Sequence, residues 1–188
     1  MKQDLLISNV GNVDRLTPFV CGIDPGKSGY MAFVSPNLKM CRTFPLERAP
    51  KVLQMNIVSL DMPLEKLAMY SPLGVFIEDQ FQNKNTMMDL GALSTLAEFH
   101  QHHFSAYDID CFRIVHSRRW QKVLGVNKNS YHQFADSLNL FKDPHDTENF
   151  KIKTRDEAAA ICVALYGIIV LIKSGILSDQ KSFKYNWE

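Results

Sequence analysis

Short apolar runs and tight turns alternate along the first quarter of the chain. Turns at Pro25-Gly26 and Pro36-Asn37 separate apolar stretches that are too short to be helices. This pattern predicts a β-meander of three antiparallel strands, at residues 18–24, 29–35 and 38–44.

Helical periodicity begins after the meander. Leu60, Leu64, Leu67 and Ala68 repeat with the spacing of one helix face, and the apolar stretch at residues 74–78 is expected to be an inner strand. Beyond it, the pattern predicts a strand at residues 109–115 and helices at residues 87–104, 117–124, 130–140 and 156–174. Together these elements predict an α/β fold, a mixed β-sheet of about five strands with helices on both faces.

The longest apolar run lies in the last of these helices, at Ala158–Ile172. As a helix, this run would extend about 22 Å. That is shorter than the roughly 30 Å hydrocarbon core of a bilayer, so we expect a helix buried in the protein.

Composition narrows the class of protein. The 188 residues, 46% hydrophobic and 22% charged, suit one compact domain. We assign residues 1–17 to an N-terminal extension, 18–175 to the folded domain and 176–188 to a tail. A net charge of +1 does not indicate a nucleic-acid binder, so such a function would depend on local patches. The four cysteines form no Cys-x-x-Cys pair and no signal peptide is evident, which predicts reduced core cysteines and a cytoplasmic protein.

The segment CGIDPGKSGYMAF, residues 21–33, combines glycine, lysine and serine as a phosphate-binding loop does. Only three residues separate Gly22 from Gly26, whereas a P-loop has four between its first glycine and its Gly-Lys pair. Because apolar residues 30–34 follow, the segment predicts a hairpin. Asp24 then lies at the end of its first strand.

Two further acids share this kind of position. Glu78 ends the strand GVFIE, and Asp156 opens the last helix. If the first and fourth strands are neighbours, their ends bring Asp24 and Glu78 together, and the last helix can add Asp156. Clustered carboxylates repel one another unless a cation neutralises them, and Mg²⁺ is the usual partner. Taken singly, each acid also fits a turn former or a side chain that complements a helix dipole.

Three motifs resemble those of the RuvC-type Holliday-junction resolvases of the RNase H-like superfamily, in particular their phage relatives. They are GIDPGKSGYMAF, FIEDQFQNKN and DEAAAICVALYG, and the resemblance extends over residues 18–172. It implies an RNase H-like nuclease fold with Asp24, Glu78 and Asp156 as catalytic metal ligands. It also implies Mg²⁺, with Mn²⁺ as a substitute and two ions per site, and Phe81 as an aromatic residue that stacks on a base.

The chain departs from this family at one position. The family often has a second acid three residues into the last helix, where this sequence has Ala159. Glu157 is adjacent, but on a helix it points about 100° away from Asp156. Whether Glu157 replaces the missing acid stays open at this point.

A basic stretch is a candidate DNA-binding surface. Residues 111–135 contain no acid, and the helix expected at 117–124 begins with HSRRWQK. Guanidinium groups and helix amides there can meet phosphates, although a solvated helix face anchored in the core by Trp120 fits the pattern as well. The candidate DNA contacts are Lys27, Phe81, Lys84, Asn85, Arg118, Arg119 and Lys122.

The predicted activity is therefore Mg²⁺-dependent hydrolysis of phosphodiesters in four-way DNA junctions, without a covalent intermediate or a nucleotide cofactor. An apolar stripe at residues 87–104 fits either a homodimer interface or a thick core. Histidines 100, 102 and 103 lack metal-pair spacing and are expected on the surface.

Three alternatives stay open: a nuclease for other branched DNA, a junction-binding protein that has lost catalysis, and an actin-like ATPase. The last has only Asp89-Leu90-Gly91 as a hint of a second phosphate loop.

Overall fold

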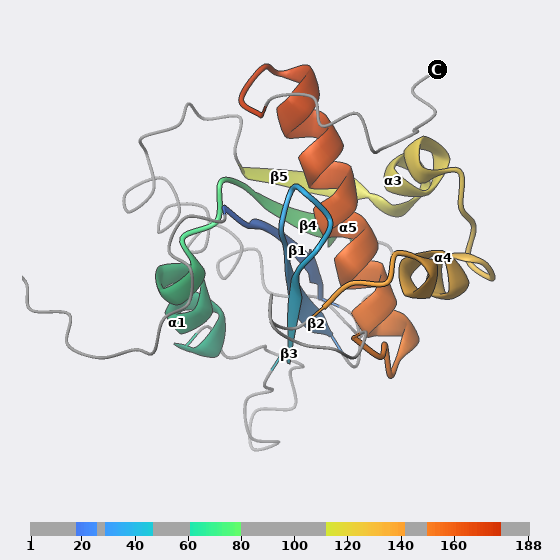
Figure 1. Cartoon of the computed structure of the whole chain (residues 1–188), viewed down its shortest axis with the longest axis horizontal. Coiled ribbons are helices and arrows are strands. Elements are labelled where there is room, and N and C mark those ends of the chain that lie inside the picture. The colour runs from blue at the N-terminus through green and yellow to red at the C-terminus, as the bar shows by residue number, and fades with distance from the viewer. Residues whose placement is uncertain (1–17, 26–28, 47–60, 80–111, 142–149, 178–188) are drawn as a thin grey trace, which may run out of the picture.

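The structure is a computed structural model that describes residues 18–25, 29–46, 61–79, 112–141 and 150–177. Its centre is one five-stranded sheet (Figure 1). The strands are β1 (Val20–Asp24), β2 (Tyr30–Val34), β3 (Cys41–Pro45), β4 (Val75–Asp79) and β5 (Phe112–His116).

The strands lie in the order β3-β2-β1-β4-β5. β1, β2 and β3 form the expected antiparallel meander, and β4 and β5 are added parallel to β1. This order and these directions, with helices on both faces, are those of the RNase H-like fold. The predicted fold class is confirmed. The first and fourth strands are neighbours, which is the condition under which Asp24 and Glu78 come together.

Helices cover both faces of the sheet (Figure 1). Long α5 crosses one face, where α3 and α4 pack beside it, and α1 packs on the other. Each strand therefore sends alternate side chains into two separate cores, as the two-residue period of a strand requires. The helices are α1 (Asp61–Tyr70), α3 (Ser117–Leu124), α4 (Tyr131–Ser137) and α5 (Arg155–Lys173).

A glycine in β1 lets α5 lie directly on the sheet. A Cβ atom at Gly22 would lie 2.2 Å from the carbonyl oxygen of Ala160 and 2.3 Å from the backbone nitrogen of Ala164. No side chain fits there without moving the helix. The contact fixes α5 over β1, two residues before the end of that strand.

The element boundaries differ most from the expected ones at α4 and β3. Helix α4 was expected over residues 130–140 but ends at Ser137, and Asn139 beyond it has a positive φ of 50°. Strand β3 was expected from residue 38 but begins at Cys41. Leu38 has a φ of 55° and belongs to the turn, in which the Ser35 hydroxyl donates to Asn37 Oδ1 at 2.7 Å and accepts from the Met40 amide at 2.9 Å. A hydrogen-bonded turn therefore replaces the first predicted pairs of the strand.

The long apolar helix is buried, as expected, from Ala158 to Leu171. Within the described ranges, no helix is both long and apolar enough to cross a bilayer. Cys21, Cys41 and Cys162 are buried free thiols, which confirms the expectation for these three cysteines. The helix expected at 87–104, with its apolar stripe and histidines 100, 102 and 103, lies outside the described residues.

Candidate metal centre

Asp24 and Glu78 lie side by side on the face of the sheet that α5 covers. In the parallel register of β1 and β4, Ile23 pairs with Ile77, so the next positions are Asp24 and Glu78. Two residues earlier along the same faces, Gly22 contacts α5, and Phe76 belongs to the core under that helix. The period of two then directs both carboxyl groups toward α5.

Neighbouring strands support this assignment of faces. Glu78 pairs with Val115 of β5 and Asp24 pairs with Tyr30 of β2, and both partners pack in the core beneath α5. The two acids are largely removed from water, with 4% of Asp24 and 8% of Glu78 exposed. A charge so buried is costly unless a partner neutralises it.

The first turn of α5 carries Asp156 to the same place. Thr154 caps the helix by accepting a hydrogen bond from the Glu157 amide, so Asp156 lies in the first turn. It precedes Ala160 by four residues, which places it one turn away on the side of the helix that rests on Gly22. The fold therefore brings the first turn of α5, with Asp156, to the side of the sheet that carries Asp24 and Glu78.

The Glu78 carboxyl group is perturbed by its burial and by the charges of the other two acids. The pKa of Glu78 is raised from 4.5 to about 8, first by burial and then by the charge of Asp24, with a smaller contribution from Asp156. A cation bound between these groups would reverse the effect, because opposite charge favours the ionised form.

The indole of Trp120 forms one wall of this site. Its side chain is 1% exposed, which confirms its expected role as a core anchor. Its N–H interacts with the Glu78 carboxyl and lowers the pKa of that group. The indole nitrogen makes no hydrogen bond of regular geometry within the described part of the chain.

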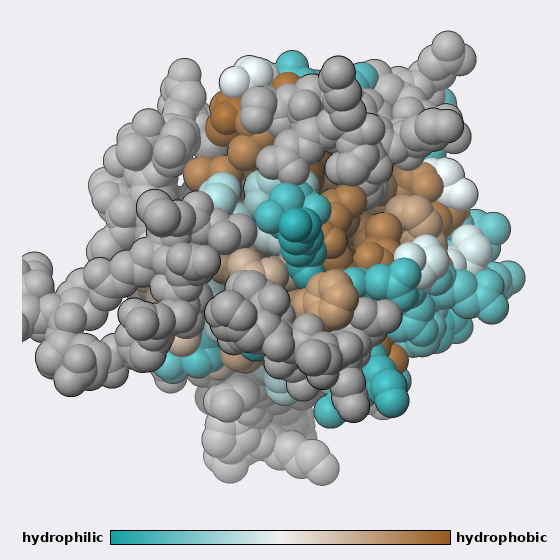
Figure 2. All heavy atoms as spheres, viewed as in Figure 1, coloured by the Kyte–Doolittle hydropathy of each residue, from teal (hydrophilic) through white to brown (hydrophobic). Residues whose placement is uncertain are grey.

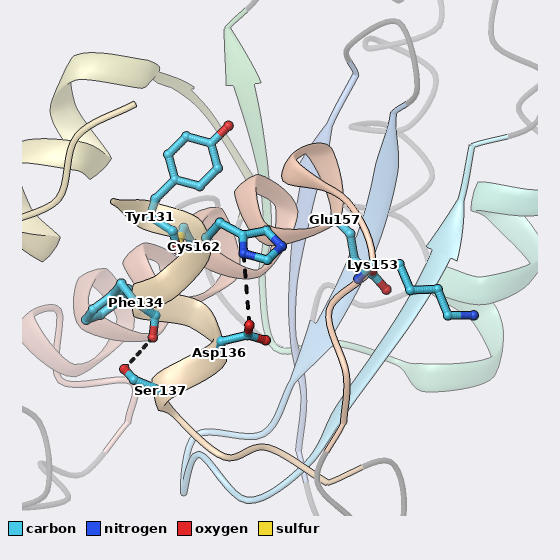
Figure 3. Close-up of polar contacts among 8 residues, drawn as sticks. Tyr131, Phe134, Asp136, Ser137, Lys153, Glu157 and Cys162 are labelled. Carbon is cyan, nitrogen blue, oxygen red and sulfur yellow. Dashed lines mark hydrogen bonds and ion pairs between the residues drawn. The ribbon is translucent and has the colours of Figure 1, made fainter. Parts of the chain in front are cut away.

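Glu157 is turned away from the other acids. Its carboxylate accepts hydrogen bonds from the Thr43 hydroxyl at 2.5 Å and from the Lys153 amide at 2.6 Å. Figure 3 shows Glu157 beside Lys153 at the start of α5, apart from Tyr131. Glu157 therefore ties α5 to β3 and does not replace the acid absent at Ala159, whose side chain is buried.

Tyr131 and Arg155 border the site, and neither was among the predicted site residues. Burial raises the pKa of Tyr131, the Arg155 guanidinium lowers it, and the charges of Asp24 and Asp156 raise it further. The Tyr131 ring packs edge-on against Trp120, with centroids 5.6 Å apart. Two features of the sequence could have indicated these residues: Arg155 directly precedes Asp156, and Tyr131 lies in the acid-free stretch at residues 111–135.

The predicted DNA-contact residues fall into two groups. Arg118, Arg119 and Lys122 are exposed on α3, around the buried Trp120. Hydrophilic residues also gather over α4, at the right of Figure 2. The other predicted contacts lie outside the described residues: Lys27, Phe81, Lys84 and Asn85.

The donor set suits a hard divalent cation. Three carboxylates offer only oxygen ligands, the kind that Mg²⁺ and Mn²⁺ prefer. Across the five described ranges, no three acidic, histidine or cysteine side chains lie close enough to hold a metal ion as they stand. A compact cage is not required, because Mg²⁺ is usually held by one or two carboxylates together with water and substrate phosphate.

Comparisons with known proteins find similarity in structure but not in sequence. No family model matches the chain, and no curated protein matches it. Its fold is similar to that of T. thermophilus RuvC in complex with a Holliday junction substrate, with 16% identity over 84% of this chain and 96% of that one and a TM-score of 0.48. A second Thermus thermophilus RuvC structure gives 14% identity over the same shares of the two chains and a TM-score of 0.47.

Proposed function

We propose that this chain is a divalent-metal-dependent endonuclease that hydrolyses phosphodiesters in four-way DNA junctions. One observation carries the proposal: Asp24 and Glu78 lie side by side on adjacent strands beneath α5. Burial, then the charge of Asp24 and, to a smaller extent, that of Asp156 raise the pKa of Glu78 to about 8. Buried like charges are costly to a fold, and a cation-dependent function gives a reason for keeping them. The three motifs shared with RuvC-type resolvases support the choice of substrate.

In this proposal Asp24, Glu78 and Asp156 hold the cations, with Mg²⁺ as the natural ion and Mn²⁺ as a substitute. Bound ions would supply an activated water and stabilise the leaving oxygen, with two ions sharing these tasks. The chain positions the ligands: β1 and β4 hold two carboxylates at the sheet, and α5 adds the third. Hydrolysis by water leaves 5′-phosphate and 3′-hydroxyl ends without a covalent intermediate.

DNA recognition is assigned to basic residues of α3 and to four further residues of the family motifs. Exposed Arg118, Arg119 and Lys122 on α3 are proposed to contact backbone phosphates. Phe81 is proposed to stack on a base, and Lys27, Lys84 and Asn85 to contact the backbone nearby. A homodimer would present two such sites to the opposite strands of a junction, whose two-fold symmetry it matches.

A second candidate is a protein that binds junctions without cutting them. Ala159 and the tethered Glu157 favour it, because the second acid that the family often has in this helix is absent. With few protein ligands, one of the two ions would depend on substrate phosphate and water for its coordination.

Cleavage of a labelled four-way junction separates these candidates. We expect the wild-type protein to cut the junction with Mg²⁺ and not with EDTA, and to leave a linear duplex of the same sequence intact. Asp24→Asn, which keeps the shape but removes a metal-binding charge, should bind the junction and fail to cut it. Binding without cutting by the wild type would favour the second candidate, and normal cutting by Asp24→Asn would disprove the site.

A further inference from the structure

The guanidinium of Arg155 is held in place at the rim of the acid site. Arg155 is the first residue of α5 and lies next to Asp156 in the chain. It donates a hydrogen bond to the carbonyl oxygen of Lys128, in the segment between α3 and α4. The guanidinium carbon also lies 5.7 Å from the centroid of the Tyr131 ring, in a cation–π contact.

Tyr131 connects Arg155 to the acids. Burial raises the pKa of the Tyr131 hydroxyl, the nearby Arg155 guanidinium lowers it, and the charges of Asp24 and Asp156 raise it further. The same ring packs against Trp120, whose N–H acts on Glu78. Ring contacts therefore join the guanidinium to Tyr131 and, through it, to Trp120.

The partners that hold Arg155 are a backbone carbonyl and an aromatic ring, both of them neutral. Its positive charge is thus kept, and the residue is exposed to solvent. Guanidinium has five N–H donors in a rigid fork that matches two oxygens of a phosphate. A side chain ordered in this way loses little conformational entropy when it binds such an oxygen.

We propose that Arg155 binds a non-bridging oxygen of the phosphate that is cut, and that Tyr131 and the Lys128 carbonyl position it. The inference rests on the proposed nuclease function and adds to it a residue that recognises the reacting group. Charge that develops on the phosphate in the transition state would be stabilised by a donor already in place. Arg118, Arg119 and Lys122 on α3 would instead contact phosphates away from the cut.

Two substitutions at Arg155 test the proposal. Arg155→Gln removes the charge and the fork, whereas Arg155→Lys keeps the charge alone. Lys39→Gln is the matched control, because Lys39 is exposed in the β2–β3 turn, at the end of the meander opposite Asp24. Single-turnover cleavage of a junction, junction affinity against salt concentration and thermal unfolding are measured for each variant. Affinities are measured in the Asp24→Asn background, so that binding is separated from cutting.

We expect Arg155→Gln to slow single-turnover cleavage by at least about 10²-fold, the usual effect of removing one transition-state donor. The slope of log affinity against log salt should fall by about one, as for one lost phosphate contact. Arg155→Lys should recover the salt slope but only part of the cleavage rate. Lys39→Gln should match the wild type in each measurement.

Cleavage by Arg155→Gln at the wild-type rate with an unchanged salt slope would overturn the inference while leaving the nuclease function standing. Equal losses in both Arg155 variants, with a matching fall in unfolding temperature, would show a purely structural role and also overturn it. A wild-type protein that neither binds nor cuts junctions would instead remove the proposed function, and this inference with it.

Discussion

Replacing Asp24 with asparagine should stabilise the protein at alkaline pH when no divalent cation is present. Folding buries Glu78 beside Asp24 and raises the Glu78 pKa from 4.5 to about 8. Because its pKa is raised in the folded state, Glu78 binds a proton more tightly there than in the unfolded chain. Its contribution to stability is complete below pH 4.5 and is lost as the pH rises toward 8. The wild-type protein should therefore become less stable over this interval.

The size of the effect follows from the shift. A rise from 4.5 to about 8 corresponds to roughly 5 kcal/mol of lost stability at high pH. Burial is its largest cause and the Asp24 charge comes next, so asparagine removes only the second part. We expect Asp24→Asn to gain about 1–2 kcal/mol of unfolding free energy at pH 8.5 and much less at pH 5, where Glu78 is protonated.

Urea unfolding at pH 5 and 8.5, in EDTA and in excess Mg²⁺, measures these differences. Asp136→Asn is the control, since this half-exposed acid on α4 pairs only weakly with His132, at 3.9 Å. Mg²⁺ should stabilise the wild type and Asp136→Asn at pH 8.5, but not Asp24→Asn. An Asp24→Asn protein that is less stable than the wild type at pH 8.5 in EDTA would refute the reasoning.

Three further substitutions test other parts of the site. Gly22→Ala should lower the free energy of unfolding by about 1–3 kcal/mol or more and abolish cutting, because the new Cβ displaces α5. Gly175→Ala is its control: Gly175 has a φ of 76° and open space around it, so this change should cost about 1 kcal/mol and leave cutting intact. Unfolding and cleavage assays measure both effects. Glu157→Gln should lower the free energy of unfolding by about 1–3 kcal/mol and leave the Mg²⁺ concentration needed for cleavage unchanged. A higher Mg²⁺ concentration needed for cleavage would instead identify Glu157 as a ligand. Trp120→Phe should raise the Glu78 pKa further, because it removes the indole that lowers this pKa. The acid limb of the pH–rate profile should then shift to higher pH, and an unshifted limb would exclude the indole interaction.

Local pattern was enough to predict the sheet and the place of its acids. Continuous apolar runs that end in Asp24 and Glu78 predict the two buried strands. Once these strands are paired, the two acids are neighbours, because side chains alternate between the faces of a sheet. The start of β3 was predicted too early, because the positive φ of Leu38 and the Ser35 hydrogen bonds have no signature in hydrophobicity.

Contacts between distant elements could not be predicted in this way. The position of Asp156 depends on how closely α5 approaches Gly22, and that distance is set by packing in three dimensions. Arg155 and Tyr131 are brought together by the packing of α4 against α5, so no spacing in the chain pairs them. Successive residues of a helix are rotated by about 100°, which indicated that Asp156 and Glu157 face different ways. The hydrogen bond between Thr43 and Glu157 appears only in the fold.

Anomalous diffraction from crystals soaked in Mn²⁺ tests the central claim most directly, because it locates the cation itself. The account predicts a peak between β1, β4 and the first turn of α5, within about 2–2.5 Å of carboxylate oxygens from at least two of Asp24, Glu78 and Asp156. Crystals of protein that cuts junctions with Mn²⁺, yet whose bound Mn²⁺ lies away from all three carboxylates, would contradict it.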